Sequence, residues 1–237
     1  MGVAKEFSKV LHSEIKVHAA WLPVTNTFRV GDYGLISDGV FIAMGNITEL
    51  GVPWNTASAP PAALDFKSAG TRVARLTGGV EVPNLPEGDI DAKLVIEFSS
   101  ENSFLIKTNL TGTLMNNMEE VSRKLVATNK WQRKFTVVSG IYQGENALIV
   151  SSRKSNSRLE ISGKATALKQ LGVGAASAGF EITASQDVGL EILGQSGTVG
   201  LQLFKVGFLG FGSGPHVLNA AAARPEELKQ ADLPDDV

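Results

Sequence analysis

Cysteine is absent from the 237 residues. Its absence excludes disulfides, thiolate metal sites, cysteine nucleophiles and S-acylation. Histidine is scarce, and His12, His18 and His216 lack partners at the spacing that a zinc site requires. The sequence also lacks the G-x-S-x-G turn of a serine hydrolase. We therefore predict no catalytic site, no metal and no cofactor, and we expect that the protein is not an enzyme.

Long apolar runs and strong net charge are absent as well. No stretch reaches the roughly 18 apolar residues of a membrane-spanning helix, and the first 16 residues have no apolar signal-peptide region. The formal net charge is −2, so no global basic field attracts nucleic acid. These features predict a soluble, cytoplasmic protein with no nucleic-acid partner.

Alternating apolar and polar residues dominate what is present. Residues 92–98 alternate between apolar side chains and Lys93 or Glu97, which is the period of a half-buried strand. Asp38-Gly39 is a strong hairpin signal between strands at 28–36 and 39–47. Further strands are expected at the following ranges: 71–80, 104–114, 134–142, 145–153, 158–163, 178–185, 188–193 and 199–208. With its three prolines, the segment 51–62 is predicted to be a loop.

Helices are predicted at three places in the body. Residues 4–15 form an amphipathic pattern, and a short helix is expected near 165–171. The range 116–129 is favoured by capping asparagines, by acidic residues in its first turn and by the i,i+4 pairs Glu119–Arg123 and Glu120–Lys124. The predicted fold class is α+β, a mainly antiparallel twisted β-sheet with a few short helices.

The chain is expected to divide into a single β-rich body at 1–212 and a short acidic tail at 213–237. The tail holds two basic and five acidic side chains, a net −3, which leaves the body at +1. Pro225 suits the first turn of a short helix in the tail.

Several local features have two interpretations. Glu87, Asp89 and Asp91 form an acidic cluster that could bind a divalent cation, although a solvated turn is the preferred interpretation. The glycine-rich segments 172–177 and 210–214 are interpreted as turns, because neither has the context of a phosphate-binding loop. Basic residues gather around Trp131 and could bind nucleic acid or lipid headgroups, but Glu119 and Glu120 offset them and favour a solvated rim.

The order of these elements resembles that of the gasdermins, in particular their compact prokaryotic members. An N-terminal amphipathic helix leads into Leu22-Pro23-Val24, a short hairpin and the GNITEL segment at 45–50. A long amphipathic β region at 71–114 follows, then the helix at 116–129 and a strand with a Val-Val-Ser core at 135–139. A second amphipathic hairpin (145–163 with 176–185) and a final strand at 199–206 close the pattern. The resemblance covers roughly residues 7–208.

This resemblance implies a gasdermin N-domain-like fold and a soluble, autoinhibited precursor with a role in bacterial defence. An activating protease would remove the tail, and the body would then move to the inner face of the cell membrane, bind lipid and form a homo-oligomeric pore. The β regions would become membrane-spanning hairpins. Candidate membrane-facing residues are Leu94, Ile96, Phe98, Leu105, Ile106, Ile149 and Ile182. Candidate inhibitory residues of the tail are Leu228 and Leu233.

Two departures from the family pattern accompany the resemblance. Compact prokaryotic members often carry an N-terminal cysteine that takes a lipid, which this chain lacks, and its basic charge is modest. An alternative function therefore stays open, namely a β-rich protein-binding or scaffold module with no membrane activity. Strands with one face on a core and one in water would have the same alternation.

Overall fold

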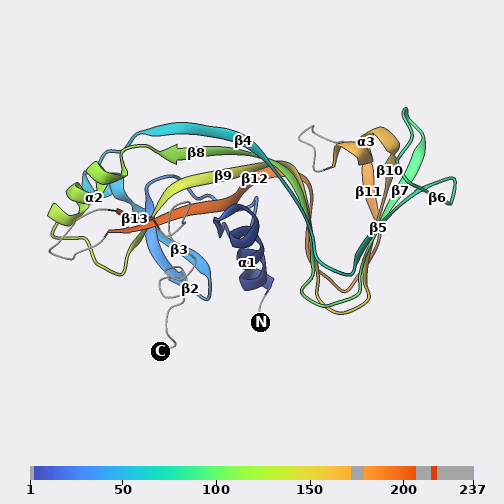
Figure 1. Ribbon diagram of the computed structural model, residues 1–237, viewed down its shortest axis with the longest axis horizontal. Helices are drawn as coiled ribbons and strands as arrows, with labels where there is room; N and C mark the ends of the chain where they lie inside the picture. The colour runs from blue at the N-terminus through green and yellow to red at the C-terminus, as the bar shows by residue number, and fades with distance from the viewer. Residues whose placement is uncertain (1–2, 172–178, 207–214, 218–237) are drawn as a thin grey trace. The chain divides into compact units, whose positions relative to one another are not determined.

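The computed structural model describes residues 3–171, 179–206 and 215–217 of the chain (Figure 1). Two sheets with a few short helices make up these residues, which confirms the predicted α+β class with mainly antiparallel pairing. The elements in chain order are α1 (Val3–Ile15), β1 (His18–Ala19), β2 (Asp32–Ser37), β3 (Val40–Asn46), the 3-10 helix η1 (Ile47–Leu50), β4 (Thr56–Lys67), β5 (Thr71–Thr77), β6 (Val80–Val82), β7 (Asp91–Phe98), β8 (Phe104–Met115), α2 (Met118–Ala127), β9 (Thr136–Ser152), β10 (Ser157–Lys164), α3 (Ala165–Gln170), β11 (Phe180–Gln186), β12 (Val188–Val206) and β13 (Pro215–Val217).

The chain forms two compact units, each with its own apolar core. Unit 1 comprises Met1–Phe7, Pro61–Thr111 and Gln143–Gly197, and unit 2 comprises Ser8–Pro60, Gly112–Tyr142 and Thr198–Val237. The boundary falls within α1 and within β4, β8, β9 and β12, so these four strands belong to both units. The sequence-based division into a body at 1–212 and a tail at 213–237 stays a prediction.

Unit 2 is built around a hairpin and a helix that the sequence predicted. Asp38 and Gly39 both have positive φ (51° and 75°) and connect β2 to β3, as a two-residue hairpin turn requires. The GNITEL segment becomes η1, where the Asn46 side chain and Glu49 form a capping box. Val121 and Leu125 of α2 are buried in a cluster with Trp131 and Phe135. The predicted pair between Glu120 and Lys124 is present at 2.6 Å.

The predicted loop at 51–62 is wrong in its second half. β4 runs through Pro60 and Pro61 and pairs with β8, as the backbone bonds Ser68 N to Phe104 O (2.9 Å) and Asn116 N to Asn55 O (3.0 Å) at its two ends illustrate. Among the described strands β8 is its one partner, so β4 is an edge strand. The side of an edge strand that faces away from its partner needs no N–H donors, so one of these two adjacent prolines costs no ladder hydrogen bond there.

Two further pairs of predicted strands are continuous. β9 joins the predicted strands 134–142 and 145–153, and β12 joins 188–193 and 199–208. Glycine is accommodated inside these strands, and Gly194 has a positive φ of 68°. Within β9, Asn146 adopts a positive φ of 47° and donates its side-chain amide to Gln170 O. Local bends of this kind allow a long strand to twist without ending.

The edge of β12 in unit 2 is covered by segments from both ends of the chain. His18 and Ala19 of β1 pair with Leu201 and Gly200, and β13 pairs antiparallel with Phe204–Val206. The Asn26 side chain also donates to Thr198 O at 2.9 Å. β13 is the one described part of the predicted tail, whereas Pro225, Leu228 and Leu233 lie outside the described residues.

His18 is the most perturbed titratable group described in unit 2. Its Nε2 is buried and has no hydrogen-bond partner among the described residues. The ring of His12 lies 6.1 Å away, centroid to centroid, a contact that the sequence analysis did not predict. Burial, and secondarily the charge of His12, lowers the pKa of His18 to about 4.

This lowered pKa predicts a loss of stability in mild acid. Above the unfolded-state pKa of about 6.5, His18 is neutral in both the folded and the unfolded protein. Below this pKa, His18 binds a proton in the unfolded protein but stays neutral in the folded protein. The free energy of unfolding should fall by about 2 kcal/mol from pH 7 to pH 5 because of this group. Urea unfolding at both pH values measures it. His18→Gln should show a smaller fall than the unsubstituted protein, and equal falls would assign the acid sensitivity to other groups.

Candidate functional site

Unit 1 contains two layers of strands with an apolar core between them. β7 and β10 contribute Leu94, Ile96, Leu159 and Ile161, which are all at most 6% exposed. The facing layer contributes residues of β8 and β9, including Leu105. Ala165 and Leu168 of α3 belong to the same cluster. Burial of these side chains is the main force that holds the layers together.

The two layers have the same lateral strand order. One sheet contains the path β12-β9-β8-β4, and the other contains β11-β10-β7-β5. Each strand of the second path is connected along the chain to the strand in the same position of the first, through the short segments 68–70, 99–103, 153–156 and 187. The second layer is therefore a strand-by-strand continuation of the first through four turns.

A row of hydrogen-bonded polar groups, which we call the serine row, connects these four turns. Ser68 Oγ accepts from Phe104 N at 2.9 Å, and Ser99 N donates to Gly70 O at 3.1 Å. Further along the row, Ser152 Oγ donates to Ser100 O at 2.7 Å and accepts from Ser103 N at 2.9 Å. Asp187 O accepts from Ser157 Oγ at 2.7 Å and from Arg153 N at 2.8 Å. These hydrogen bonds hold each turn against its neighbour, so the turns form one connected structure.

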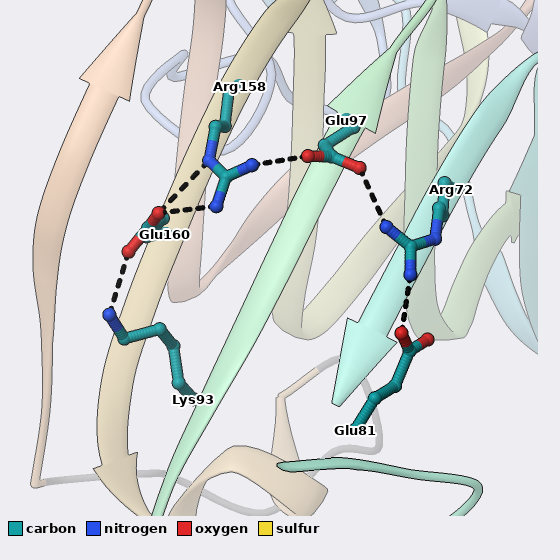
Figure 2. Close-up of polar contacts among 6 residues, drawn as sticks. All are labelled: Arg72, Glu81, Lys93, Glu97, Arg158 and Glu160. Carbon is teal, nitrogen blue, oxygen red and sulfur yellow. Dashed lines mark hydrogen bonds and ion pairs between the residues drawn. The ribbon is translucent and has the colours of Figure 1, made fainter. Parts of the chain in front are cut away.

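The outer face of the β5–β6–β7–β10 region carries a ladder of six charged residues (Figure 2). Arg72 bridges Glu81 and Glu97, and Arg158 bridges Glu97 and Glu160. Lys93 completes the ladder with a 2.8 Å contact to Glu160. In the strand register Glu97 lies directly opposite Arg72 on one side and Arg158 on the other. The side chains alternate in sign, so each charge has a neighbour of opposite sign.

Electrostatics within the ladder favour the charged forms. Hydrogen bonds from Lys93 and then Arg158 lower the pKa of the Glu160 carboxyl, and the hydrogen bond to Glu160 raises the pKa of Arg158. Because most of these side chains are substantially exposed, such pairs contribute little to stability individually. The ladder consequently determines the electrostatic character of this face more than it determines the stability of the sheet.

The seven predicted membrane-facing residues are distributed over different surfaces. Leu94, Ile96, Phe98 and Leu105 lie together in the unit 1 core. Ile106 is adjacent to Leu105 in β8 and therefore points to the opposite face, where the Phe7 ring of α1 contacts Phe104 at 5.7 Å between centroids. Ile149 is likewise fully buried, and Ile182 of β11 is 44% exposed. Whether these residues contact lipid stays a prediction.

The other candidate features of the sequence have ordinary structural roles. Each carboxylate of the acidic cluster has its own partner: Glu87 pairs with Lys169, Asp91 pairs with Lys164, and Asp89 accepts from Thr166. Within the described ranges no group of three His, Asp or Glu side chains could hold a metal ion. Trp131 is only 7% exposed, so it offers no ring for stacking on a nucleic-acid base. The glycine-rich segments 172–177 and 210–214 lie outside the described residues.

Sequence reasoning missed the charge ladder and the serine row. The signal for the ladder was the polar half of each alternating strand, but the cross-strand partners could not be identified without the register. In the part of the chain that is described, no helix is long and apolar enough to cross a bilayer.

The chain is similar to a solved structure at low sequence identity. No family model matches the chain, and no curated protein matches it. A bacterial gasdermin from Bradyrhizobium tropiciagri is similar to it at 15% sequence identity, covering 90% of both chains with a TM-score of 0.35. At this TM-score the similarity carries no information about function, which has to come from the geometry of the chain itself.

The contact between neighbouring turns predicts a specific cost at Gly70. Gly70 has a φ of +76°, and a Cβ at this position would lie 2.0 Å from Ser99 Oγ. Gly78 also has a positive φ (57°), but a Cβ there would meet nothing within 4 Å. Gly70→Ala should therefore lower the free energy of unfolding by about 1–2 kcal/mol more than Gly78→Ala does. Urea unfolding measures both losses.

Adding Ser99→Ala to Gly70→Ala should recover part of the difference, because it removes the clashing oxygen. Equal losses for the two alanine variants would contradict a close contact between the turns.

Proposed function

We propose that this chain is a gasdermin-like pore-forming protein, held inactive by its C-terminal segment until a protease cleaves it and then oligomerising in a lipid membrane. The observation that carries the proposal is the continuity of the two layers of unit 1. If the four turns straighten, β4 joins β5, β7 joins β8, β9 joins β10 and β11 joins β12. The result is two long hairpins, one built from β4–β5 and β7–β8 and the other from β9–β10 and β11–β12. Each joined strand is longer than the 9–11 residues that a membrane strand needs.

The side-chain pattern of the joined strands supports this proposal. In β7 and β8 most apolar residues have even numbers on both sides of the turn, from Leu94 and Ile96 to Phe104 and Ile106, and Val95 and Leu105 are exceptions. The odd positions include Lys93 and Lys107. A straightened strand would therefore have one mainly apolar and one mainly polar face, the pattern of a transmembrane barrel strand.

The buried state of these strands fits a protein that must be activated. In the folded chain the even face of β8 is covered by Phe7 of α1, and the even face of β7 lies in the unit 1 core. Membrane insertion would exchange both contacts for lipid. Because the serine row and the core must open first, the resting protein would not insert spontaneously.

Restraint by the C-terminal segment has a physical route in β13. β12 is the outer strand of the β4-β8-β9-β12 path, and in an oligomeric barrel its edge would pair with a neighbouring protomer. β13 occupies part of that edge at Phe204–Val206. The segment that begins at Pro215 thus blocks strand pairing at these three residues, and β1 covers the same edge at Gly200 and Leu201. Docking through Leu228 and Leu233 is a further part of the proposal.

A second candidate function, a protein-binding module, is favoured by two exposed apolar side chains. Ile42 and Met44 of β3 are 52% and 56% exposed. Apolar groups this exposed on a strand are a common feature of protein-binding surfaces. A module of this kind would need no membrane activity.

Cleavage of the folded protein separates the two functions. We would insert a site-specific protease sequence between Gly214 and Pro215 in one version and between Val217 and Leu218 in another. Dye release from liposomes of anionic bacterial lipid is measured before and after cleavage, with protease alone as control. Cleavage before β13 should cause leakage, and cleavage after β13 should cause less, because the edge of β12 stays covered.

Silence from both cleaved versions, with the protein still folded, would favour the binding module. Equal leakage from both versions would keep the pore but assign the restraint to residues after 217.

A substitution on the apolar face tests the insertion step. Ile182 lies opposite Ile161 in the strand register and is half exposed, so Ile182→Asp should leave the folded protein intact. In a membrane strand this aspartate would face lipid, and cleaved protein should lose most of its leakage activity. Thr183→Asp, on the neighbouring position of the same strand, is the matched control. Undiminished leakage from Ile182→Asp would contradict insertion of β11.

A further inference from the structure

Two histidines of unit 2, His12 and His18, lie side by side although one belongs to a helix and the other to a strand. Lys16 N donates to His12 O at 3.1 Å and closes the last turn of α1. Lys16 has a positive φ of 57°, a left-handed conformation that is typical of the residue after a helix. The chain turns back at this point, and the imidazole rings of His12 and His18 are 6.1 Å apart between centroids.

Regular secondary structure holds both rings in place. His12 lies in the last turn of α1, and its neighbour Leu11 is fully buried. His18 lies in β1, which pairs antiparallel with β12. The residue before it, Val17, packs so closely that a Cβ on Gly200 would lie 2.7 Å from Val17 Cγ2. Side chains that stand on a helix and a paired strand are positioned more precisely than side chains on loops.

The separation of the two rings is that of two ligands on one metal ion. A zinc–nitrogen bond is about 2.0–2.1 Å long, so the centroid of a bound imidazole lies about 3.2 Å from the ion. Two rings on one ion therefore have centroids about 5.2 Å apart at a tetrahedral angle and at most about 6.4 Å apart. The 6.1 Å between His12 and His18 falls within this interval.

The buried nitrogen of His18 needs a partner. Its Nε2 has no hydrogen bond among the described residues, and a buried polar atom in this state costs free energy. Metal ions bind the neutral form of imidazole, and burial favours this form because it lowers the pKa of His18. At His12 the negative end of the α1 dipole also stabilises a cation. A metal ion between the rings would satisfy the nitrogen that the fold leaves unpaired.

Ligand chemistry narrows the choice of ion. Imidazole nitrogen suits Zn²⁺, Cu²⁺ and Ni²⁺, whereas Mg²⁺ and Ca²⁺ prefer oxygen ligands. Thiolate ligands are excluded because the chain has no cysteine. With two protein ligands, water would take the remaining positions around the ion. Such a site is weaker and exchanges its ion more readily than a closed structural zinc site.

We infer that His12 and His18 form a binding site for Zn²⁺ or a similar divalent transition-metal ion, which joins the end of α1 to β1. Their spacing is not that of a zinc motif, so this inference departs from the sequence-based expectation of no metal. It goes beyond the proposed function and does not depend on it. Because β1 covers the edge of β12 at Gly200 and Leu201, a bound ion would also strengthen that cover.

Isothermal titration calorimetry with ZnCl₂ tests the site, using the full uncleaved chain without a histidine tag at neutral pH. The unsubstituted protein should bind one ion per chain, and MgCl₂ should give no binding. His12→Gln and His18→Gln should each weaken zinc binding by roughly tenfold or more, because each removes one of two protein ligands. His216→Gln is the matched control, since it removes the remaining histidine of the chain, and should bind zinc with unchanged affinity.

Urea unfolding with and without ZnCl₂ keeps the test decisive if His18→Gln folds poorly. Zinc should raise the unfolding midpoint of the unsubstituted protein and of His216→Gln. It should not raise the midpoint of His12→Gln, a change at a partly exposed position that should keep the fold. Unchanged zinc affinity in His12→Gln, an equal loss in His216→Gln, or no binding to the unsubstituted protein at millimolar zinc would each overturn the inference.

Discussion

Burial of the apolar side of β7 and β10 against β8 and β9 is the interaction on which unit 1 depends. Adjacent residues of a strand point to opposite faces, so β8 has to bury Leu105 on one side and Phe104 with Ile106 on the other. The second layer satisfies the first requirement, and Phe7 of α1 contributes to the second. A strand that is apolar on both sides cannot remain at a solvent-exposed surface, and this explains why the sheet is folded over itself.

The charged face is the counterpart of that burial. Because the apolar sides of β7 and β10 are turned inward, their polar sides are gathered on one outer surface, where Arg72, Glu97 and Arg158 alternate in sign. Because these paired side chains are largely exposed, they keep most of their hydration, and each charge has a neighbour of opposite sign. The same strands therefore have two surfaces of opposite character that are separated by a single layer of backbone. Under the proposed function one surface meets lipid and the other meets water, and neither has to be rebuilt.

Local chemistry made part of this architecture predictable. The Asp38-Gly39 hairpin and the pair Glu120–Lys124 depend on neighbouring residues, and both were found from the sequence. β4 was missed because proline excludes a central strand but not an edge strand, and edge position is decided by the whole sheet. The ladder was missed for a similar reason, since Glu97 is 25 residues from Arg72 and 61 from Arg158. The serine row was missed because a sequence does not distinguish polar turn residues that only contact water from polar turn residues that hydrogen-bond to a neighbouring turn.

The pairing of β1 with β12 has a consequence for how the chain is made. Asn26 binds the carbonyl of Thr198, 172 residues further along, and β1 pairs with residues that are later still. At about 5–20 residues per second, a ribosome needs roughly 10–35 s to synthesise the intervening chain. Throughout that time the first strand has no partner, because its partner does not yet exist. The nascent N-terminal segment is therefore available to chaperones. A ribosome that stalls before Thr198 releases a product in which β1 has no strand to pair with.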